Sequence, residues 1–175
     1  MKIGIIGTGN MGPRPSALDK TVSVSGPSTR VSVSASRTID APIERVWAEV
    51  ANFNNVAVWH PDVTESVLEA GSTGTIAGDV RSIRLRDGSV VRERLLSIDP
   101  VQHQYVYSVL DGQIPVKAHR SSVTMQDLDG RQTTVTWEAS FEPAGAPADV
   151  LAAGVKSGVL ELGLSGLADR VRDAI

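Results

Sequence analysis

The sequence predicts an α+β fold: a curved antiparallel sheet of about seven strands wraps around a long C-terminal helix, with two short helices after the first strand. Three observations predict it. Apolar and polar residues alternate from residue 30, strand-like segments separated by turns continue to residue 143, and the last part of the chain spaces its apolar residues as a helix does. Strands first and one long helix last are typical of a sheet and a helix that share one core.

Separate signals predict the first strand and the two short helices. Residues 30–39 alternate between apolar and small polar side chains, which is typical of a strand with one buried face. Pro42 suits the first turn of a helix, which apolar residues at helical spacing continue to Ala51. A second short helix, residues 55–60, ends before Pro61, because a proline disfavours helical backbone in the residue before it.

Six further strand-like segments follow, separated by turns that contain Gly, Asp-Gly or Asp-Pro. They are residues 63–68, 74–85, 90–98, 104–110, 116–128 and 133–141. One long helix over residues 147–175 ends the chain, and four glycines interrupt it, at positions 154, 158, 163 and 166. Either these glycines let the helix pack closely on the sheet or they let it bend.

Composition limits the classes of protein to consider. The chain has 175 residues, 41% of them hydrophobic, which is enough for one domain with a core. The net charge is −3 and the basic residues are scattered, so we expect no nucleic-acid partner. The absence of cysteine excludes disulfides and fits a cytoplasmic protein. The N-terminal apolar run, Ile3 to Ile6, is too short for a membrane span, so we expect no membrane insertion; oligomeric state stays open.

The first twelve residues, MKIGIIGTGNMG, resemble the start of NADP-dependent oxidoreductases. Their glycines have the G-x-G-x-x-G spacing of a loop that holds a pyrophosphate. A helix must follow such a loop, but Pro13, Pro15 and a stretch rich in Ser, Thr, Gly and Pro follow instead. We therefore expect a flexible N-terminal extension over residues 1–29, no bound cofactor, and a single domain over residues 30–175.

Four stretches of the remaining chain align, in order and spacing, with a known superfamily. They are APIERVWAEVANFNNVAVWHPDV, GTIAGDVRSIRLRDGSVVRERLLSIDP, YVYSVLDGQIPV and TTVTWEASFEP. These stretches resemble the SRPBCC superfamily, also called START-like or polyketide cyclase/dehydrase-like. The resemblance implies a helix-grip fold with a deep, mostly apolar cavity between the sheet and the long helix. It also implies that the cavity binds or transforms a hydrophobic small molecule.

Two charged residues fall on the apolar faces of predicted strands. Arg81 shares a face with apolar residues in DVRSIRLRDG, and Glu93 does so in SVVRERLLS. A two-residue turn between the strands would place Arg81 opposite Arg94, which is a pair of like charges. A three-residue turn, Arg86 to Gly88 with a left-handed glycine, places Arg81 opposite Glu93 instead. We predict this second register.

A buried arginine and glutamate must pair whatever the function, so a structural ion pair is one interpretation. In the other, Glu93 moves a proton while Arg81 holds it charged, orients it or stabilises an oxyanion. The resemblance favours the second, since both residues align with an arginine and a glutamate implicated in a plant isomerase of the superfamily that works without a cofactor. Where that isomerase has a tyrosine, this chain has His119, which could be a general acid or base or a hydrogen-bonded wall residue.

Other side chains are candidates for ligand contact. Tyr105 and Tyr107 share one strand face, and Trp59 and His60 stand at the expected rim of the cavity. The histidines and Glu93 lack the spacing of a metal site, so no metal is expected. We expect a cofactor-independent cyclase, dehydratase or isomerase that acts on a hydrophobic small molecule. The alternatives are a carrier or sensor of such a ligand and, third, a reductase partner that kept its nucleotide loop.

Overall fold

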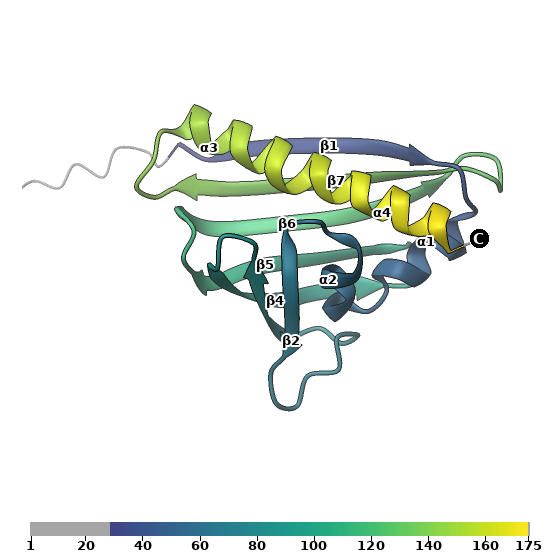
Figure 1. Cartoon of the computed structure of the whole chain (residues 1–175), viewed down its shortest axis with the longest axis horizontal. Coiled ribbons are helices and arrows are strands. Elements are labelled where there is room, and N and C mark those ends of the chain that lie inside the picture. Colours follow the sequence, from purple (N-terminus) through teal and green to yellow (C-terminus); the bar gives the residue numbers. More distant parts are fainter. Residues whose placement is uncertain (1–28, 175) are drawn as a thin grey trace, which may run out of the picture.

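The chain forms one antiparallel sheet of seven strands in the order β1-β7-β6-β5-β4-β3-β2 (Figure 1). This computed structural model describes residues 29–174, so the N-terminal glycine motif lies outside the described residues. The strands are β1 (Val31–Ile39), β2 (Val63–Leu68), β3 (Val80–Leu85), β4 (Val90–Asp99), β5 (Gln104–Gly112), β6 (Val116–Asp127) and β7 (Thr133–Pro143). The predicted α+β class and the antiparallel order of the strands are confirmed.

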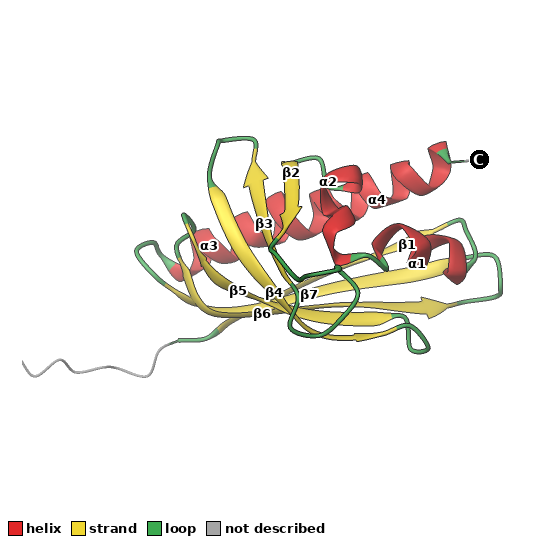
Figure 2. Ribbon diagram, turned by 90° about the horizontal axis from the view of Figure 1, so that it is seen from below, coloured by secondary structure: helices red, strands yellow, loops and turns green. Residues whose placement is uncertain are grey.

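Short helical elements between β1 and β2 cover one end of the sheet, and the long C-terminal helix crosses the same face (Figure 2). The short elements are α1 (Ile43–Val50), the 3-10 turn η1 (Phe53–Asn55) and α2 (Val56–Trp59). The first buries Val46, Trp47 and Val50. A first strand, short helical elements and a sheet that curves around a long helix form the helix-grip fold that the resemblance implies.

The long helix has three parts: α3 (Ala148–Gly154), the π-helical segment η2 (Val155–Glu161) and α4 (Leu162–Asp173). The sequence predicted one long helix here, and its π-helical middle was not part of that prediction. The 26 residues Ala148–Asp173 are long and apolar enough to cross a membrane by length and composition alone. A core helix passes the same test, and this helix packs against the other elements of the domain.

The four glycines of the helix divide into two kinds. A Cβ atom added at Gly166 would lie 2.1 Å from the carbonyl oxygen of Trp59, and one at Gly163 would lie 2.5 Å from the ring of Trp137. At Gly154 and Gly158 an added Cβ would meet no atom within 4 Å. Close packing, one of the two predicted roles, therefore applies to Gly163 and Gly166.

One predicted strand is partly wrong, because residues 74–79 form a loop instead of the first half of β3. The loop folds around the buried carboxylate of Asp79, whose Oδ2 atom accepts several hydrogen bonds of 2.7–3.1 Å. The donors are the Thr73 hydroxyl and the N–H groups of Thr73, Gly74, Thr75 and Ile76. A buried acceptor that collects N–H groups replaces the sheet hydrogen bonds that a strand would make.

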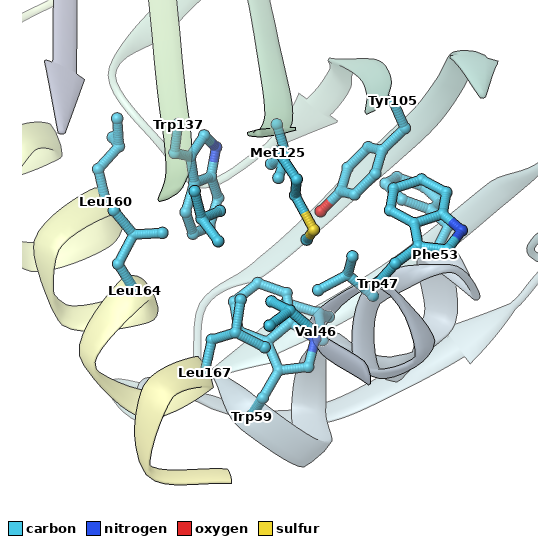
Figure 3. Packing of buried hydrophobic residues seen from close by; sticks show 14 of the residues in the cluster. Val46, Trp47, Phe53, Trp59, Tyr105, Met125, Trp137, Leu160, Leu164 and Leu167 are labelled. Carbon is cyan, nitrogen blue, oxygen red and sulfur yellow. The ribbon is translucent and has the colours of Figure 1, made fainter. Parts of the chain in front are cut away.

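The hydrophobic core lies between the sheet, the short helices and α4, as Figure 3 shows. Trp47 and Phe53 pack there beside Tyr105 and Met125, while Leu164 and Leu167 of the long helix approach Trp59 and Trp137. This packed region occupies one end of the space under the helix and leaves the other end for a cavity.

Candidate functional site

A cavity of about 390 Å³ lies between the sheet and the N-terminal half of the long helix, with a mostly apolar lining. Strands β3 to β7 supply its floor, the loop Ile114–Val116 one wall, and α3 and η2 its cover. A concave apolar site with a few polar groups is what small-molecule sites in proteins have in common. The polar side chains that line it are His60, Asp62, Arg81, Glu93, Tyr107, His119 and Ser121.

The β3–β4 hairpin brings the two charged residues together. Arg81 pairs with Glu93 across the strands, and Ile83 pairs with Val91, as the three-residue turn predicted. The turn closes with a hydrogen bond from the N–H of Leu85 to the carbonyl of Ser89, and Gly88 has a φ of 88°. The left-handed glycine is therefore what fixes the register that puts both charges on the cavity face.

Arg81 is held on every side. Its Nε and Nη2 atoms donate to Oε2 of Glu93 at 2.8 and 2.7 Å, and its Nη1 atom donates to the carbonyl oxygen of Phe53. The guanidinium carbon lies 3.6 Å from the centre of the Phe53 ring, in the geometry of a cation–π contact. Only 3% of Arg81 is exposed, so the side chain is fixed in one position before any ligand binds.

Glu93 is also buried, with 6% of its surface exposed, and lines the cavity. Among the described residues, only Arg81 donates hydrogen bonds to its carboxylate, and both are accepted by Oε2. The other carboxylate oxygen, Oε1, is therefore the one left for a ligand. A fixed carboxylate with one oxygen available in an apolar space is suited to accept a proton or a hydrogen bond.

Of the two tyrosines, Tyr107 lines the cavity, whereas Tyr105 lies outside its lining, in the core beside Phe53. Burial raises the pKa of Tyr105 to about 12. Burial, and secondarily the negative charge of Glu93, raises the pKa of Tyr107 well above its ordinary value. Both phenols therefore stay protonated, and Tyr107 offers the cavity a hydroxyl that can donate a hydrogen bond.

His119 lines the cavity on the same face of β6 as Ser121, two residues further along. A β-bulge lies beside it: the β6–β7 register shifts between Lys117 and Arg120, and Ala118 has a φ of 47°. Nδ1 of His119 accepts the N–H of Val109 at 3.2 Å, so Nε2 carries the proton and faces the Ser121 hydroxyl at 3.0 Å. Burial, assisted by the charge of Arg30, lowers the pKa of His119 to about 4. Because the ring is neutral and both of its nitrogens are engaged, we favour the interpretation of His119 as a hydrogen-bonded residue of the cavity wall.

His60 and Trp59 lie deeper than a rim. His60 lines the cavity and is buried; its Nδ1 accepts the N–H of Asp62 at 3.1 Å, so its Nε2 donates to the carbonyl of Val159 at 3.0 Å. Burial lowers the pKa of His60. Trp59 is buried in the core, edge-on to Trp137, and lies outside the cavity lining. Trp59 and Tyr105 thus belong to the core and not to the lining of the cavity.

Sequence reasoning missed several lining residues. Ser121 is small and polar on an apolar face, and its place beside His119 in the alternating pattern was the available signal. The cover of the cavity was harder to find, since Val150, Leu151 and Val155 lie in or just before the π-helical segment, and their sequence is that of an ordinary helix. Over residues 29–174 the structure groups no three His, Asp or Glu side chains as a metal site needs.

Comparison with known proteins agrees with this geometry. Residues 30–172 match the family described as polyketide cyclase / dehydrase and lipid transport. The chain resembles the structure of a protein from Bacillus thuringiensis with 26% identity and a TM-score of 0.72, over 82% of this chain and 100% of that one. A protein from Thermobifida fusca has 29% identity and a TM-score of 0.72, over 81% and 93%.

A START superfamily protein from Mycobacterium smegmatis shares the fold, with 15% identity and a TM-score of 0.70 over 82% of this chain and 99% of that one. Fold, cavity and family together support a role in binding a hydrophobic ligand. The chain belongs to the polyketide cyclase / dehydrase and lipid transport family.

Proposed function

We propose that this protein is a cofactor-independent enzyme of the cyclase, dehydratase or isomerase kind, which moves a proton on a hydrophobic small molecule held in the cavity. The observation that carries the proposal is the buried pair of Arg81 and Glu93 on the wall of an apolar cavity. Charged groups rarely remain in such surroundings unless they are paired, and they are frequent at functional sites.

In this proposal Glu93 transfers the proton through Oε1, while Arg81 binds Oε2 and fixes the position of the carboxylate. Tyr107 remains protonated and donates a hydrogen bond to an oxygen of the ligand as charge develops there. His119 is proposed to line the site as a neutral ring that holds the Ser121 hydroxyl. The dry lining strengthens each of these interactions relative to water.

A specific observation favours the second candidate function, a carrier or sensor of the same ligand. Arg81 is fully held by Glu93 and Phe53, so the ion pair is satisfied as a structural element without any chemistry. In this case Glu93 and Tyr107 anchor the polar end of the ligand and leave it unchanged.

The first experiment identifies the ligand. The protein is purified from its own host and analysed by native mass spectrometry for small molecules that co-purify. An Arg81→Ala/Glu93→Ala double variant serves as the control. A hydrophobic compound that the wild type carries and the folded double variant lacks places the pair in the binding site, whereas equal loading of both proteins reduces Arg81 and Glu93 to a structural pair.

The second experiment separates enzyme from carrier. The identified compound is incubated with the protein in deuterated water, and its deuterium content is followed by mass spectrometry. An enzyme that moves a proton introduces deuterium at the reacting carbon, and Glu93→Gln abolishes this exchange while binding is retained. If the wild type exchanges no deuterium and leaves the compound unchanged, the carrier function stands.

A further inference from the structure

We propose that Glu93 sets the charge class of the ligand: by occupying the anion-binding side of Arg81, it restricts the cavity to neutral molecules and rejects carboxylates. The inference rests on the proposed function only in that a hydrophobic molecule binds in this cavity. It does not depend on whether that molecule is transformed.

The geometry of Arg81 supplies the first argument. An arginine binds a free carboxylate most strongly through two N–H groups on one edge of its guanidinium group. In this chain that edge, Nε and Nη2, is used by Oε2 of Glu93, and Nη1 is used by the carbonyl of Phe53. A carboxylate of a ligand could therefore bind this edge of Arg81 only by displacing Glu93.

The other groups that line the cavity supply the second argument. Arg81 is the one Lys or Arg side chain among the described residues of the lining. His60 and His119 are neutral, because burial lowers the pKa of each ring. Tyr107 is protonated and Asp62 contributes a further acidic side chain. An anionic headgroup would thus meet two carboxylates and no available cation, which is costly in an apolar space.

A neutral polar end fits the same groups well. A hydroxyl group can donate to Oε1 of Glu93, and a hydroxyl or ketone oxygen can accept from the phenol of Tyr107. The apolar remainder of such a molecule would lie against the loop Ile114–Val116 and under Val150 and Val155. The ligand class is therefore an alcohol, enol or ketone with an apolar body.

The test compares two probes of equal chain length that differ in charge, dodecanol and dodecanoate, at a pH where the carboxylate is ionised. Their dissociation constants are measured by displacement of an apolar fluorescent dye. We expect wild type to bind dodecanol at least about tenfold more tightly. In Glu93→Gln the positive charge of Arg81 is no longer neutralised, so the affinity for dodecanoate relative to that for dodecanol rises about tenfold or more.

Two control variants separate local from general effects. Glu65→Gln removes the same charge from an exposed ion pair and should leave both dissociation constants unchanged. Arg81→Met/Glu93→Gln removes both buried charges and should bind dodecanol without gaining dodecanoate. If Glu93→Gln fails to fold, as judged by circular dichroism, wild type is instead tested with methyl dodecanoate. We expect this neutral ester to bind where the carboxylate does not.

Distinct results overturn the inference and the proposed function. Equal affinity of wild type for dodecanol and dodecanoate, or a folded Glu93→Gln that gains no affinity for dodecanoate, overturns the charge inference alone. The charge inference is also overturned if methyl dodecanoate binds no better than dodecanoate. Binding of no probe by any folded variant removes the ligand-binding function, and the inference with it.

Discussion

The two halves of the C-terminal helix have different roles. The C-terminal half, α4, buries Gly163, Leu164, Leu167 and Val171 against the core. The N-terminal half covers the cavity, and over α3 and η2 the only buried residue is Leu160, at the end next to α4. Val150 and Val159 in this half expose 59% and 39% of their surfaces. One half therefore stabilises the domain while the other forms the cover of the cavity.

The difference between the halves shows that one apolar helix can be closely packed over part of its length and loosely packed over the rest. The closely packed glycines lie in the stabilising half, where they bring the helix backbone against the chain around Trp59 and Pro61. Segments with few buried contacts open locally at low cost in free energy, and binding elements are drawn from such segments. We therefore expect the cover to open at a lower cost in free energy than α4.

The largest effect is expected from Gly166→Ala, in the stabilising half. The new Cβ would overlap the carbonyl oxygen of Trp59, which is backbone and cannot move aside easily. We expect a loss of about 1–3 kcal/mol in the free energy of unfolding. At this chain length the melting temperature should fall by about 2–4 °C for each kcal/mol. An unchanged melting temperature in thermal denaturation would contradict the close packing of this half.

An intermediate effect is expected from pH, because two histidines, His60 and His119, line the cavity. Both pKa values are lowered in the folded state, that of His119 to about 4, from an unfolded value of about 6.5. The unfolded chain therefore binds more protons as the pH falls through this range. The free energy of unfolding should be highest above pH about 6.5 and decrease toward pH about 4.

Single variants His60→Gln and His119→Gln locate this pH dependence, measured by urea denaturation at several pH values. Each should flatten the decrease between neutral and acidic pH, since glutamine does not titrate. His60→Gln should act more on the packing of the junction, where His60 bonds to the carbonyl of Val159. A slope that neither variant changes would assign the acid sensitivity to other groups.

The smallest effect is expected from Gly158→Ala, in the covering half. An added Cβ there meets nothing within 4 Å, so the substitution only removes backbone freedom from the unfolded chain. We expect a gain of about 0.5–1 kcal/mol in the free energy of unfolding. Dye binding should stay unchanged, because Gly158 does not line the cavity. A loss of stability here would show that both halves are packed alike.

Much of the fold could be predicted from the sequence because its signals are local. Alternation of apolar and polar residues predicted the strands, and the length of one turn predicted that Arg81 faces Glu93. The strand prediction was wrong for residues 74–79, because hydrogen bonds to a single carboxylate, that of Asp79, hold them in a loop. The alternation of apolar and polar residues does not reveal such hydrogen bonds.

The site was harder to predict where it depends on contacts distant in the sequence. The bond from Arg81 to the carbonyl of Phe53 joins residues 28 positions apart and involves a backbone atom, which no residue type reveals. Tyr105 and Tyr107 share a strand face and Phe53 packs against both, yet only Tyr107 lines the cavity. Which side chain reaches the cavity depends on how neighbouring side chains fill the space around it. The alternation of residues along a strand carries no information about this packing.

The π-helical segment η2 has a consequence for how this protein tolerates insertions and deletions. Each residue of an α-helix advances the chain by about 100° around the helix axis. A π-helical turn closes i→i+5 hydrogen bonds and therefore holds an extra residue. Removing one residue from Val155–Glu161 would let this segment close as an ordinary α-helix, with α3 keeping its orientation relative to α4. The same deletion within α4 would turn Leu151, which now lines the cavity, away from it. The π-helical segment is therefore the part of the helix that can absorb a change in chain length without a change in the cavity wall.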